Sequence, residues 1–507
     1  EGAKPEEVAL RYHKIITSSL EEMGISFDLF THTHTPEHEA AVHEILGRLD
    51  EAGFIEPRTT TAPYDPKAGQ FLPDRYVEGT CPHCKSTGAR GDQCDECGKP
   101  LDADELIDPH PKLNPEVALE FRETEHLFFR LSAFREKLLE WLAEGKEHWK
   151  SNVLNFTRNW LEEGLVDRAI TRDLEWGIPV PREGYEDKRI YVWFEAVIGY
   201  LSAAKEWARR QGDPEAWRDW WEGDDARSVY FIGKDNIPFH TIIWPAMLTG
   251  YGDLNLPTDV PANQYLTFKG GKASASRGVG LTIGEGLRLF EPDALRYALA
   301  ASFPEQSDTD ISVEEIARRT NDELVATWGN LVNRVLSMVN AMCDGLVPEP
   351  GDRTDIDLAL LAGVDAALVT AADQIDRVEL RAALRTAMEA AAEVNAYLNV
   401  TEPWKLVRTD PDRARVVLGT ALDAVNGVRV AFSPYLPFSS SVLEEVLGPV
   451  EGWRRPELSP GRPIDKPPPL FAKVDLEALE SGEPGGASPR TFAGSTATAI
   501  SAATPTR

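Results

Sequence analysis

The first 270 residues alternate between short apolar runs and stretches in which apolar positions recur every three to four residues. The helical spacing predicts one helix over residues 5–23 and a second that starts at Thr35, with Thr35 as its cap and Pro36 in its first turn. The short runs predict strands over residues 26–30, 125–131, 176–181, 190–194, 228–232 and 264–268. Strands that alternate with helices indicate a parallel α/β sheet.

The pattern changes after residue 320. Residues 321–447 keep a period of 3.6 and are rich in Ala, Leu, Val and Glu, with breaks near Pro348, Pro403 and Pro434. This predicts a bundle of about five helices. We expect an extended arm over residues 456–469 and a disordered tail from about residue 480, where Gly, Ser, Ala and Thr dominate.

Between the two patterns lies a stretch, residues 53–163, that is rich in Pro, Gly, Asp and Cys and ends in two predicted helices, 132–144 and 150–163. Four of the five cysteines have the spacing C-x2-C-x9-C-x2-C: Cys81, Cys84, Cys94 and Cys97. Two such pairs predict a zinc knuckle with four thiolate ligands; two disulfides are the alternative, and nothing in the sequence indicates secretion. Cys343 is expected to be a buried small apolar residue.

Charge alone does not identify the partner. The net charge of −30, from 53 basic and 83 acidic residues, argues against a nucleic acid. The acidic residues are spread along the whole chain, however, which is typical of a cytoplasm of very high salt, where the screening length falls to about 3 Å at 1 M. We therefore expect a halophilic, cytoplasmic protein. The chain contains no apolar run of 18 residues, so no membrane span is predicted.

The most informative stretch runs from Tyr230 to Trp244. A predicted strand ends at Gly233 and is followed by Lys234, Asp235 and Asn236, at the edge where parallel sheets bind ligands. His240 and Trp244 are four residues apart, on one helix face. The pattern predicts a small-molecule pocket; the alternative is a capped helix start with an aromatic residue in the core.

Two further features have a functional and a structural interpretation. The Gly- and Ser-rich basic loop, residues 270–278, has the composition of a phosphate-binding loop or of a surface loop, and the chain contains no GxxxxGK[ST] motif. Four histidines lie close together at the start of the chain and suit a metal site or, the interpretation that we favour, a loop and an exposed helix face: His32, His34, His38 and His43.

Several strings together resemble methionyl-tRNA synthetases of class I, in an archaeal-type form. Residues 191–200 resemble the family's methionine-pocket segment, 231–248 its nucleotide and methionine segment, 72–81 its connective peptide, 272–276 its KMSKS loop and 330–334 its anticodon-reading helix. The resemblance covers residues 1–475. It implies a Rossmann-type parallel nucleotide-binding sheet interrupted by a zinc-knuckle insertion, followed by an all-α anticodon-binding bundle.

The family's division of the chain is implied as well. We expect the following parts: residues 1–52, the rest of the first half of the Rossmann domain; 53–171, the connective-peptide insertion; 172–280, the second half of the Rossmann domain; 281–320, a stem-contact region; 321–455, the anticodon-binding domain; 456–507, an arm and tail.

The resemblance also implies roles for individual residues. The catalytic residues would be Lys272, Arg172 and Asp235. ATP, as its Mg²⁺ complex, would be bound by Gly233, Lys234, Asp235, Asn236, Lys272, Ser274 and Ser276. The methionine side chain would be bound by Trp193, Ala196, Tyr200, His240 and Trp244. The tRNA anticodon would be read by Asn330 and Arg334 with Trp453 as a stacking partner. The partners would be L-methionine, ATP and methionine tRNA, and the chain is expected to be a monomer.

The sequence departs from the family at four points. The loop is KASAS, so Ala275 replaces the second lysine, and Lys272, with help from Arg277, would carry the pyrophosphate interaction. Val197 replaces a common proline. Residues 62–65 lack a second cysteine pair, so we expect one zinc. No H-x-G-H occurs, so the HIGH segment is expected to lie upstream and this chain is expected not to activate methionine by itself. The alternatives are another class I synthetase, of the Leu, Ile or Val type, and an inactive RNA-binding fragment.

Overall fold

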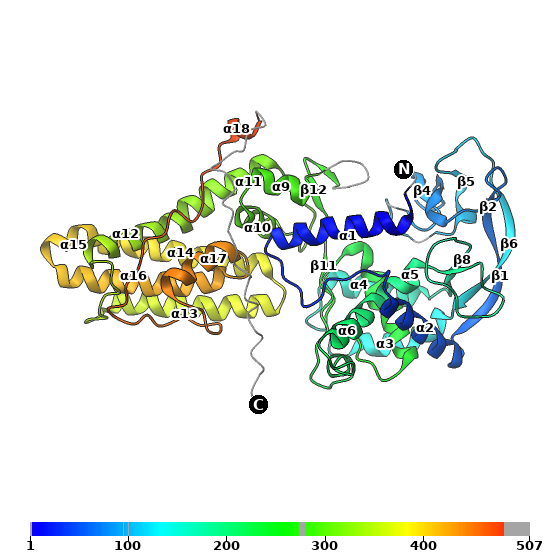
Figure 1. The fold of residues 1–507 in the computed structure, drawn as a ribbon, viewed down its shortest axis with the longest axis horizontal. Coiled ribbons are helices and arrows are strands. Elements are labelled where there is room, and N and C mark those ends of the chain that lie inside the picture. The colour runs from blue at the N-terminus through cyan, green and yellow to red at the C-terminus, as the bar shows by residue number, and fades with distance from the viewer. Residues whose placement is uncertain (1–2, 95, 100, 273–279, 481–507) are drawn as a thin grey trace. The chain divides into compact units, whose positions relative to one another are not determined.

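The computed structural model describes residues 3–94, 96–99, 101–272 and 280–480. The chain divides into two compact units, one formed mainly by residues 27–263 and one mainly by residues 264–507. The predicted first helix is α1 (Pro5–Glu22), which contributes residues to both units (Figure 1). No helix in the described part of the chain is long and apolar enough to cross a membrane.

In the first unit, α2 (Pro36–Glu51) begins as predicted, because Thr35 accepts the His38 backbone N–H and Pro36 occupies the first turn. The expected strand at residues 26–30 is wrong. No neighbouring strand pairs with this segment among the described residues; Phe27 stays half exposed and Phe30 stacks on His13.

A long antiparallel pair follows, in a sheet of order β2-β1-β6-β7 in which Ile55 is opposite Phe129. The apolar inner end of this pair joins the large core of the unit together with the two predicted helices of the insertion. The elements are β1 (Ile55–Asp65), β2 (Gln70–Phe71), β6 (Glu120–Phe129), η3 (Leu131–Phe134), α3 (Arg135–Ala143), α4 (Ser151–Glu163) and β7 (Arg168–Ala169).

The cysteine-rich segment has a separate small core, formed by Val77, Cys81, Ala89, Cys94, Leu101, Ala103 and Leu106. Its three-stranded sheet has the order β4-β3-β5. The elements are η1 (Asp74–Tyr76), β3 (Val77–Thr80), β4 (Thr87–Arg90), η2 (Ala103–Glu105) and β5 (Ile107–Pro111). A core of its own is therefore found for residues 77–106, whereas α3 and α4 pack into the larger core.

Two predicted strands of the next segment are corrected. Residues 176–181 form one isolated bridge, because Pro179 and Pro181 have no N–H to donate to a ladder. Residues 192–194 are helical, so the strand that was expected over 190–194 ends at Ile190. The elements are β8 (Thr171–Arg172), β9 (Arg189–Ile190), α5 (Val192–Glu195), η4 (Ala196–Ile198), α6 (Gly199–Arg210) and α7 (Arg218–Trp221).

The central segment has the predicted strand–turn–helix form. Strand β10 (Ile232–Gly233) pairs in parallel with β11 (Ala262–Asn263), with Gly233 opposite Asn263. Upstream, the Tyr230 N–H donates to Asp259 O. The strand leads into η5 (Lys234–Asn236), a π-helical turn η6 (Phe239–Ile243) and α8 (Trp244–Tyr251).

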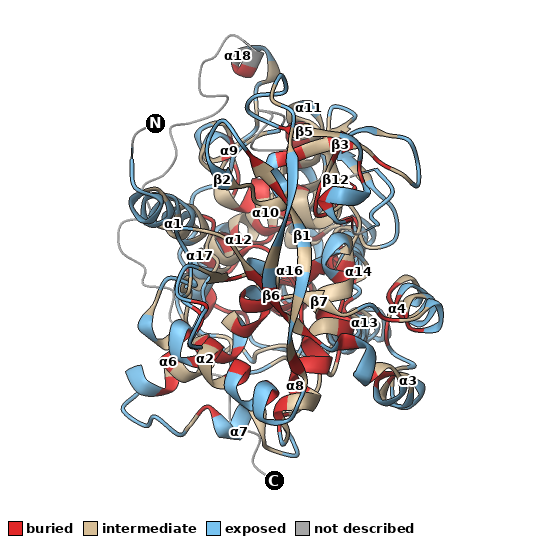
Figure 2. Ribbon diagram, turned by 90° about the vertical axis from the view of Figure 1, so that its right-hand side faces the viewer, coloured by how far each residue is buried: buried red, intermediate tan, exposed pale blue. Residues whose placement is uncertain are grey.

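The second unit begins with a small sheet in which β12 (Leu266–Phe268) pairs antiparallel with β13 (Gly271–Lys272) and parallel with β14 (Thr309–Ile311). The sheet is followed by the predicted helix bundle, in which α16 is almost entirely buried (Figure 2). The helices are α9 (Ile283–Leu289), α10 (Pro292–Ala301), α11 (Val313–Arg319), η8 (Thr320–Gly329), α12 (Asn330–Met342), α13 (Asp355–Asp376), α14 (Leu380–Thr401), α15 (Pro403–Thr409), α16 (Pro411–Phe432), α17 (Pro437–Leu447) and α18 (Leu476–Glu480).

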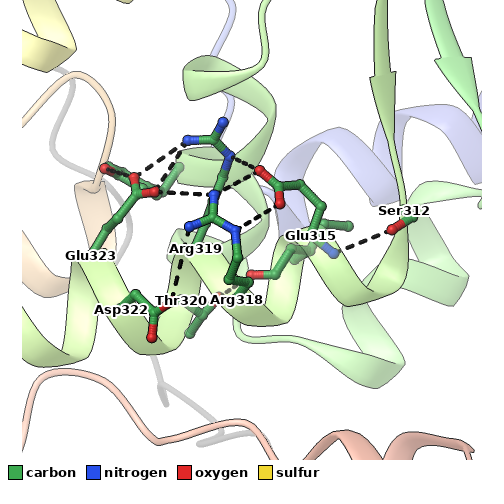
Figure 3. A network of polar contacts seen from close by, with 9 residues as sticks. Ser312, Glu315, Arg318, Arg319, Thr320, Asp322 and Glu323 are labelled. Carbon is green, nitrogen blue, oxygen red and sulfur yellow. Dashed lines mark hydrogen bonds and ion pairs between the residues drawn. The ribbon is translucent and has the colours of Figure 1, made fainter.

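Helix α11, the π-helical η8 and α12 follow one another without a break. Charged side chains tie the first junction together (Figure 3): Arg318 and Arg319 both contact Glu315 at 2.8 Å, and Arg319 also contacts Glu323 at 3.3 Å. Such pairs between residues three or four apart stabilise a helix by about 0.2–0.5 kcal/mol each. They support the segment that leads to Asn330.

The bundle has the predicted breaks near Pro348, Pro403 and Pro434, and two further breaks, at residues 377–379 and at Asp410, were not predicted. Glu402 has a left-handed φ of 44° between α14 and α15. Residues 456–469 form the expected extended arm, which packs on the bundle core through the buried Ile464. Cys343 is buried in the same core, as expected. The tail that was expected to be disordered, residues 481–507, lies outside the described residues.

Candidate functional site

The four cysteines of the knuckle come together after β3. Their sulfur atoms all lie within 4.8 Å of one another, with Sγ–Sγ distances of 3.9 Å for Cys81 and Cys97 and 3.6 Å for Cys84 and Cys94. Ligands at about 2.3 Å from a tetrahedral Zn²⁺ lie about 3.8 Å apart, so the spacing fits this ion. It excludes disulfides, whose sulfurs are about 2.05 Å apart.

The knuckle thiols are shifted in opposite directions: burial and the neighbouring thiols raise the pKa of Cys97, whereas the pKa of Cys81 is lowered. Burial raises the pKa of the Cys81 thiol, but the backbone N–H groups of Cys84 and His83 and the neighbouring thiols outweigh burial and lower the pKa to about 7. The thiolate is the form that binds metals. Because Cys81 and Cys94 are buried while Cys84 and Cys97 are exposed, an ion would lie at the edge of the small core.

The nucleotide segment lies where the sequence predicts it. Gly233 ends β10, and Lys234, Asp235 and Asn236 form the next turn, at the carboxyl end of a parallel strand pair. Asn263, opposite Gly233, was not predicted as a site residue. Its side-chain oxygen is buried and accepts no hydrogen bond within the described residues, which marks it as a candidate contact for a ligand.

The candidate methionine-pocket residues converge from two segments that are about 40 residues apart. The Trp193 ring lies edge-on to the Phe239 ring at 4.9 Å between centroids. The Tyr200 ring lies 5.5 Å from that of His240 and 4.9 Å from that of Tyr230. Ala196 is exposed on the turn between Trp193 and Tyr200. The geometry thus adds two aromatic residues, Tyr230 and Phe239, that sequence analysis missed although both lie inside the motif.

Hydrogen bonds determine the protonation of His240. Its Nδ1 lies 2.9 Å from Asn236 O, a pure acceptor, so Nδ1 carries the proton. Nε2 is then the acceptor for the Tyr200 hydroxyl at 2.8 Å. Burial lowers the pKa of His240, so the ring is neutral at pH 7. The pocket wall therefore carries no charge at this position.

Trp244 supports the pocket from behind. Its side chain is completely buried, and its indole N–H donates to the Tyr230 hydroxyl at 3.0 Å. His240 and Trp244 both face Tyr230, as their spacing predicts, and they do so through a π-helical turn, a feature that is frequent at functional sites.

Arg172 is linked to the pocket through Tyr191. Its guanidinium lies over the Tyr191 ring at 3.9 Å, and the Tyr191 ring lies 5.9 Å from that of Trp193. The Nε group of Arg172 donates to Asp74 at 2.9 Å. Burial raises the pKa of Asp74, and the positive charge of Arg172 opposes that rise. Asp74 belongs to the insertion and was also missed from the sequence.

The histidines at the start of the chain divide into two groups. His32, His34 and His43 are partly or fully exposed, as expected. His38 is not: it is 1% exposed and contacts Ser202 and Glu195. The expectation of an exposed helix face is therefore wrong for His38, because this side of α2 packs on α6.

The phosphate loop is described only in part. The backbone of Lys272 lies in β13, paired with Thr267. Ser274, Ala275, Ser276 and Arg277 lie outside the described residues. Lys272 belongs to the second unit, whereas Arg172, Asp235 and the pocket residues belong to the first.

The candidate anticodon residues lie on α12. Asn330 is exposed, and Arg334 reaches the side-chain oxygens of Asn395 and Asn399 at 3.3 and 3.4 Å. The aromatic residue next to Arg334 is Trp404 of α15, at 5.5 Å from the guanidinium carbon to the ring centroid. The expected partner, Trp453, donates its indole N–H to Leu368 O on α13 instead. Trp404 directly follows the predicted break at Pro403, a signal that could have identified it.

Comparisons with known proteins identify the family of the chain. Residues 1–336 match the family model for tRNA synthetases class I (M), and residues 347–483 match the anticodon binding domain of methionyl tRNA ligase. The chain is 46% identical to a methionine–tRNA ligase of Thermobifida fusca, over 95% of this chain and 87% of the relative. It is 51% identical to one of Dehalococcoides mccartyi, with the same coverage.

A solved structure is similar over the same length. Mycobacterium tuberculosis methionyl-tRNA synthetase in complex with methionyl-adenylate matches with a TM-score of 0.76 and 28% identity, over 93% of this chain and 87% of that one. Since a family model covers more than half of the chain and close relatives cover nearly all of it, the chain belongs to the methionyl-tRNA synthetases, in class I of the tRNA synthetases.

Proposed function

We propose that the chain is a methionine–tRNA ligase, which activates L-methionine with ATP and transfers it to methionine tRNA. The observation that carries this proposal is the convergence of Trp193, Tyr200, Tyr230, Phe239 and a neutral His240 around one side of the first unit. Sulfur–aromatic contacts contribute about 0.3–1.5 kcal/mol each, and an uncharged aromatic wall suits a thioether. Ala196 leaves room in the wall, and Trp244 supports it.

The proposed reaction has two steps. In the first, a carboxylate oxygen of methionine attacks the α-phosphorus of ATP, which is bound as its Mg²⁺ complex; the bond to the β-phosphate oxygen breaks, and pyrophosphate leaves. In the second, the terminal ribose hydroxyl of the tRNA attacks the carbonyl carbon of methionyl-adenylate, loses its proton, and AMP leaves. Phosphoryl transfer of this kind depends mainly on positioning and charge stabilisation.

The residues that the resemblance implies fit this chemistry. Gly233, Lys234, Asp235 and Asn236 would bind the ribose and adenine side at the end of β10. Arg172, held by Asp74, and Lys272 would stabilise the negative charge that develops on the phosphates, with Ser274 and Ser276 as further donors. Removal of one such preorganised donor costs about 2.7–4 kcal/mol.

For tRNA recognition we propose Asn330, Arg334 and Trp404, with Trp404 in place of Trp453. Anticodon bases are single-stranded, and proteins read such bases by hydrogen bonds to their edges and by stacking on aromatic or guanidinium planes. Arg334 and Trp404 present two such planes next to each other.

The knuckle is proposed to bind one structural Zn²⁺ through Cys81, Cys84, Cys94 and Cys97. The ion would crosslink a small core that is otherwise short of apolar residues. Metal analysis of the purified chain should give about one zinc per chain. Free reaction of all four thiols with a thiol reagent in the folded protein would contradict this proposal.

Several finer expectations also remain proposals: the six parts of the chain with bounds at residues 52, 171, 280, 320 and 455, the archaeal-type connective peptide at residues 72–81, the monomeric state, and a cytoplasmic, high-salt setting. The last can be tested in the activity assay itself, by comparing rates at low and at molar KCl. A rate that falls steadily with KCl would contradict the high-salt interpretation.

Methionine-dependent ATP–pyrophosphate exchange by this chain, followed by charging of methionine tRNA, tests the function. Matched reactions contain isoleucine, leucine or valine in place of methionine. Exchange with methionine alone would support the function and would overturn the expectation, drawn from the missing H-x-G-H, that this chain does not activate methionine by itself. Exchange with one of the other amino acids would identify another class I specificity, and tRNA binding without any exchange would identify an RNA-binding protein.

A further inference from the structure

A buried chain of polar contacts joins α2 to the turn that carries the candidate methionine-pocket residues. His38 Nε2 lies 2.6 Å from the Glu195 carboxylate, and His38 Nδ1 lies 2.9 Å from the Ser202 hydroxyl. The three residues are 1%, 9% and 3% exposed, respectively. All three belong to the first unit, and none has a role in the proposed chemistry.

The direction of these hydrogen bonds follows from the donor inventory. The Ser202 hydroxyl donates its one proton to Gly199 O at 3.1 Å, so it accepts from His38 Nδ1–H. The second contact, between His38 Nε2 and Glu195, contains one proton shared by a ring nitrogen and a carboxylate oxygen. Both ring nitrogens are therefore engaged, and the imidazole cannot rotate without breaking two buried hydrogen bonds.

The same geometry excludes a nucleophilic triad, which a Ser–His–Glu set brings to mind. A nucleophilic serine must be accessible to substrate and must donate its proton to the histidine. Ser202 is almost completely buried and donates to a backbone carbonyl instead. The contacts hold the backbone in place and do not form a second reaction centre.

The two ends of the contact chain lie on either side of a weak structural element. Glu195 ends α5, a helix of four residues, and Ser202 lies in the first turn of α6; between them is η4, a 3₁₀ turn of three residues. Residues 192–210 are helical without a break, but the 3₁₀ stretch at residues 196–198 interrupts the α-helical pattern, and such a stretch within a helix often marks a hinge or local strain. The geometry of this stretch therefore depends on tertiary contacts.

The pocket residues lie on this same weak element. Trp193 is in α5, Ala196 opens η4, and Tyr200 is in the first turn of α6. A change in the angle between α5 and α6 would move the Trp193 ring relative to the Tyr200 ring. A misplacement of about 1 Å in a reactive complex can reduce a rate about 100-fold.

We propose that His38 is a positioning residue that holds the turn between Trp193 and Tyr200 at both ends and thereby sets the shape of the methionine pocket. This inference rests on the proposed function for the identity of the ligand. The two buried contacts of His38, which we call the clamp, do not depend on the proposed function, because they are a property of the fold. The same contacts explain why a histidine is placed at the third position of α2, where its backbone N–H is bound by Thr35 and its side chain points into the core.

Three variants and one control test the proposal. His38→Gln removes the bridge between two partners, because one amide group cannot reproduce both imidazole contacts. Ser202→Ala removes one end only. Glu195→Gln keeps an acceptor for His38 and serves as the conservative variant. His43→Gln is the matched control, since His43 lies in the same helix and its ring bonds to Pro179 O and not to Glu195 or Ser202.

The first readout is ATP–pyrophosphate exchange measured against both substrates. For His38→Gln we expect kcat/KM for methionine to fall about 10- to 100-fold while KM for ATP stays within about twofold. The kcat/KM of Ser202→Ala for methionine should lie between the values of His38→Gln and wild type. The values of Glu195→Gln and His43→Gln should lie within about threefold of wild type. An equal loss for methionine and ATP in His38→Gln would overturn the proposal, as would a loss of the same size in His43→Gln.

The second readout is hydrogen–deuterium exchange, which needs no activity. His38→Gln should increase exchange in peptides from residues 192–202 and leave the last two turns of α2 unchanged. If wild type shows no methionine-dependent pyrophosphate exchange, the proposed function fails, and hydrogen–deuterium exchange alone then tests whether His38 holds residues 192–202 in place. Unchanged protection of residues 192–202 would then overturn that role of His38, and so would a uniform increase across the first unit.

Discussion

The candidate methionine pocket in the first unit and the candidate anticodon surface in the second are built in opposite ways. The pocket brings together side chains from residues 193–200 and 230–244 and links them with hydrogen bonds of 2.8–3.0 Å, of which one is buried and two are partly buried. At the anticodon surface, Arg334 reaches Asn395 and Asn399 at 3.3 and 3.4 Å from a partly exposed helix face.

The difference matches the two tasks. A pocket for a small apolar side chain gains most from walls that are already in position, because little binding energy is available to rearrange them. A surface that reads bases must exchange its own hydrogen bonds for bonds to RNA, so long and exposed contacts are an advantage. From this comparison we expect the two regions to respond differently to mutation.

The largest expected effect is on the anticodon surface. Arg334→Ala should reduce kcat/KM for methionine tRNA charging about 100-fold, because hot-spot residues of an interface contribute about 2–4 kcal/mol. Asn330→Ala and Trp404→Ala should have smaller effects in the same direction. Adenylate formation, measured by pyrophosphate exchange, should stay unchanged. Arg377→Ala, which changes an exposed arginine directly after α13, is the control, and unchanged charging by Arg334→Ala would remove Arg334 from the anticodon site.

The second effect is on the pocket and should have the reverse pattern. His240→Ala leaves the Tyr200 hydroxyl and Asn236 O without their partner, and an unmade buried hydrogen bond costs about 1–3 kcal/mol. We expect KM for methionine to rise about 10- to 100-fold, with KM for ATP nearly unchanged; Trp193→Ala should behave alike. Tyr200→Phe, which removes one hydroxyl, should have a smaller effect. An equal loss for both substrates would show that the pocket lies elsewhere.

A third prediction concerns Arg172, which contacts Tyr191 beside the pocket and Asp74 of the insertion. Asp74→Asn should weaken the contact that orients the Arg172 guanidinium. We expect kcat for adenylate formation to fall about tenfold, in line with about 1.5–3 kcal/mol for a hydrogen bond to a charged group. KM for methionine should change little. Asp104→Asn, in the same insertion, is the control, and a matching loss in that variant would show general damage to the knuckle.

The smallest effect on turnover is expected from a pair of buried carboxyl groups in the second unit. Burial raises the pKa of Asp293 to about 6, and hydrogen bonds from the Ser439 and Phe438 backbone oppose that rise. At Asp357, burial also raises the pKa, but hydrogen bonds from Arg413, Tyr397 and Thr354 outweigh it and lower the pKa below its usual value. The two groups therefore contribute to stability with opposite signs.

Between pH 3.8 and about 6 the folded state holds a proton on Asp293 that the unfolded state releases, so this contribution is present below pH 4 and is lost as the pH rises through 6. It amounts to about 3 kcal/mol at most. The contribution of Asp357 is present above pH 4 and is lost at lower pH. In thermal melts from pH 4 to 7, the Tm of wild type should fall relative to the Tm of Asp293→Asn, because the variant has no titrating group at this position. Parallel profiles would contradict the assignment.

Local patterns predicted much of this molecule. The start of α2 at Thr35, the helices of the bundle and their breaks at prolines follow from capping, periodicity and the missing N–H of proline, which act over a few residues. The cluster of the four cysteines was predicted in the same way, since the thiols of a knuckle are close to one another in sequence. The face shared by His240 and Trp244 follows from their spacing alone.

Other predictions failed where distant segments decide the outcome. Residues 192–194 have β-branched and aromatic side chains, yet they form a helical turn, and the contacts of Glu195 and Ser202 with His38 act on that turn. Residues 26–30 have the composition of a strand but no strand pairs with them. His38 was assigned to an exposed face, but the packing of α2 on α6 buries it, and the contact of Trp404 with Arg334 was not foreseen.

By itself the sequence determined the class of fold and the family resemblance and supplied the candidate metal ligands and site residues, because motif spacing and helical periodicity are local properties of the chain. The tertiary structure decided which side chains meet: Tyr230 and Phe239 in the pocket, Asp74 on Arg172, Trp404 on Arg334 and His38 under the pocket turn. These contacts join residues from 30 (Tyr200 and Tyr230) to 157 (His38 and Glu195) positions apart. Whether a polar side chain is buried with a partner or exposed to water depends on what packs against it, which no local pattern contains.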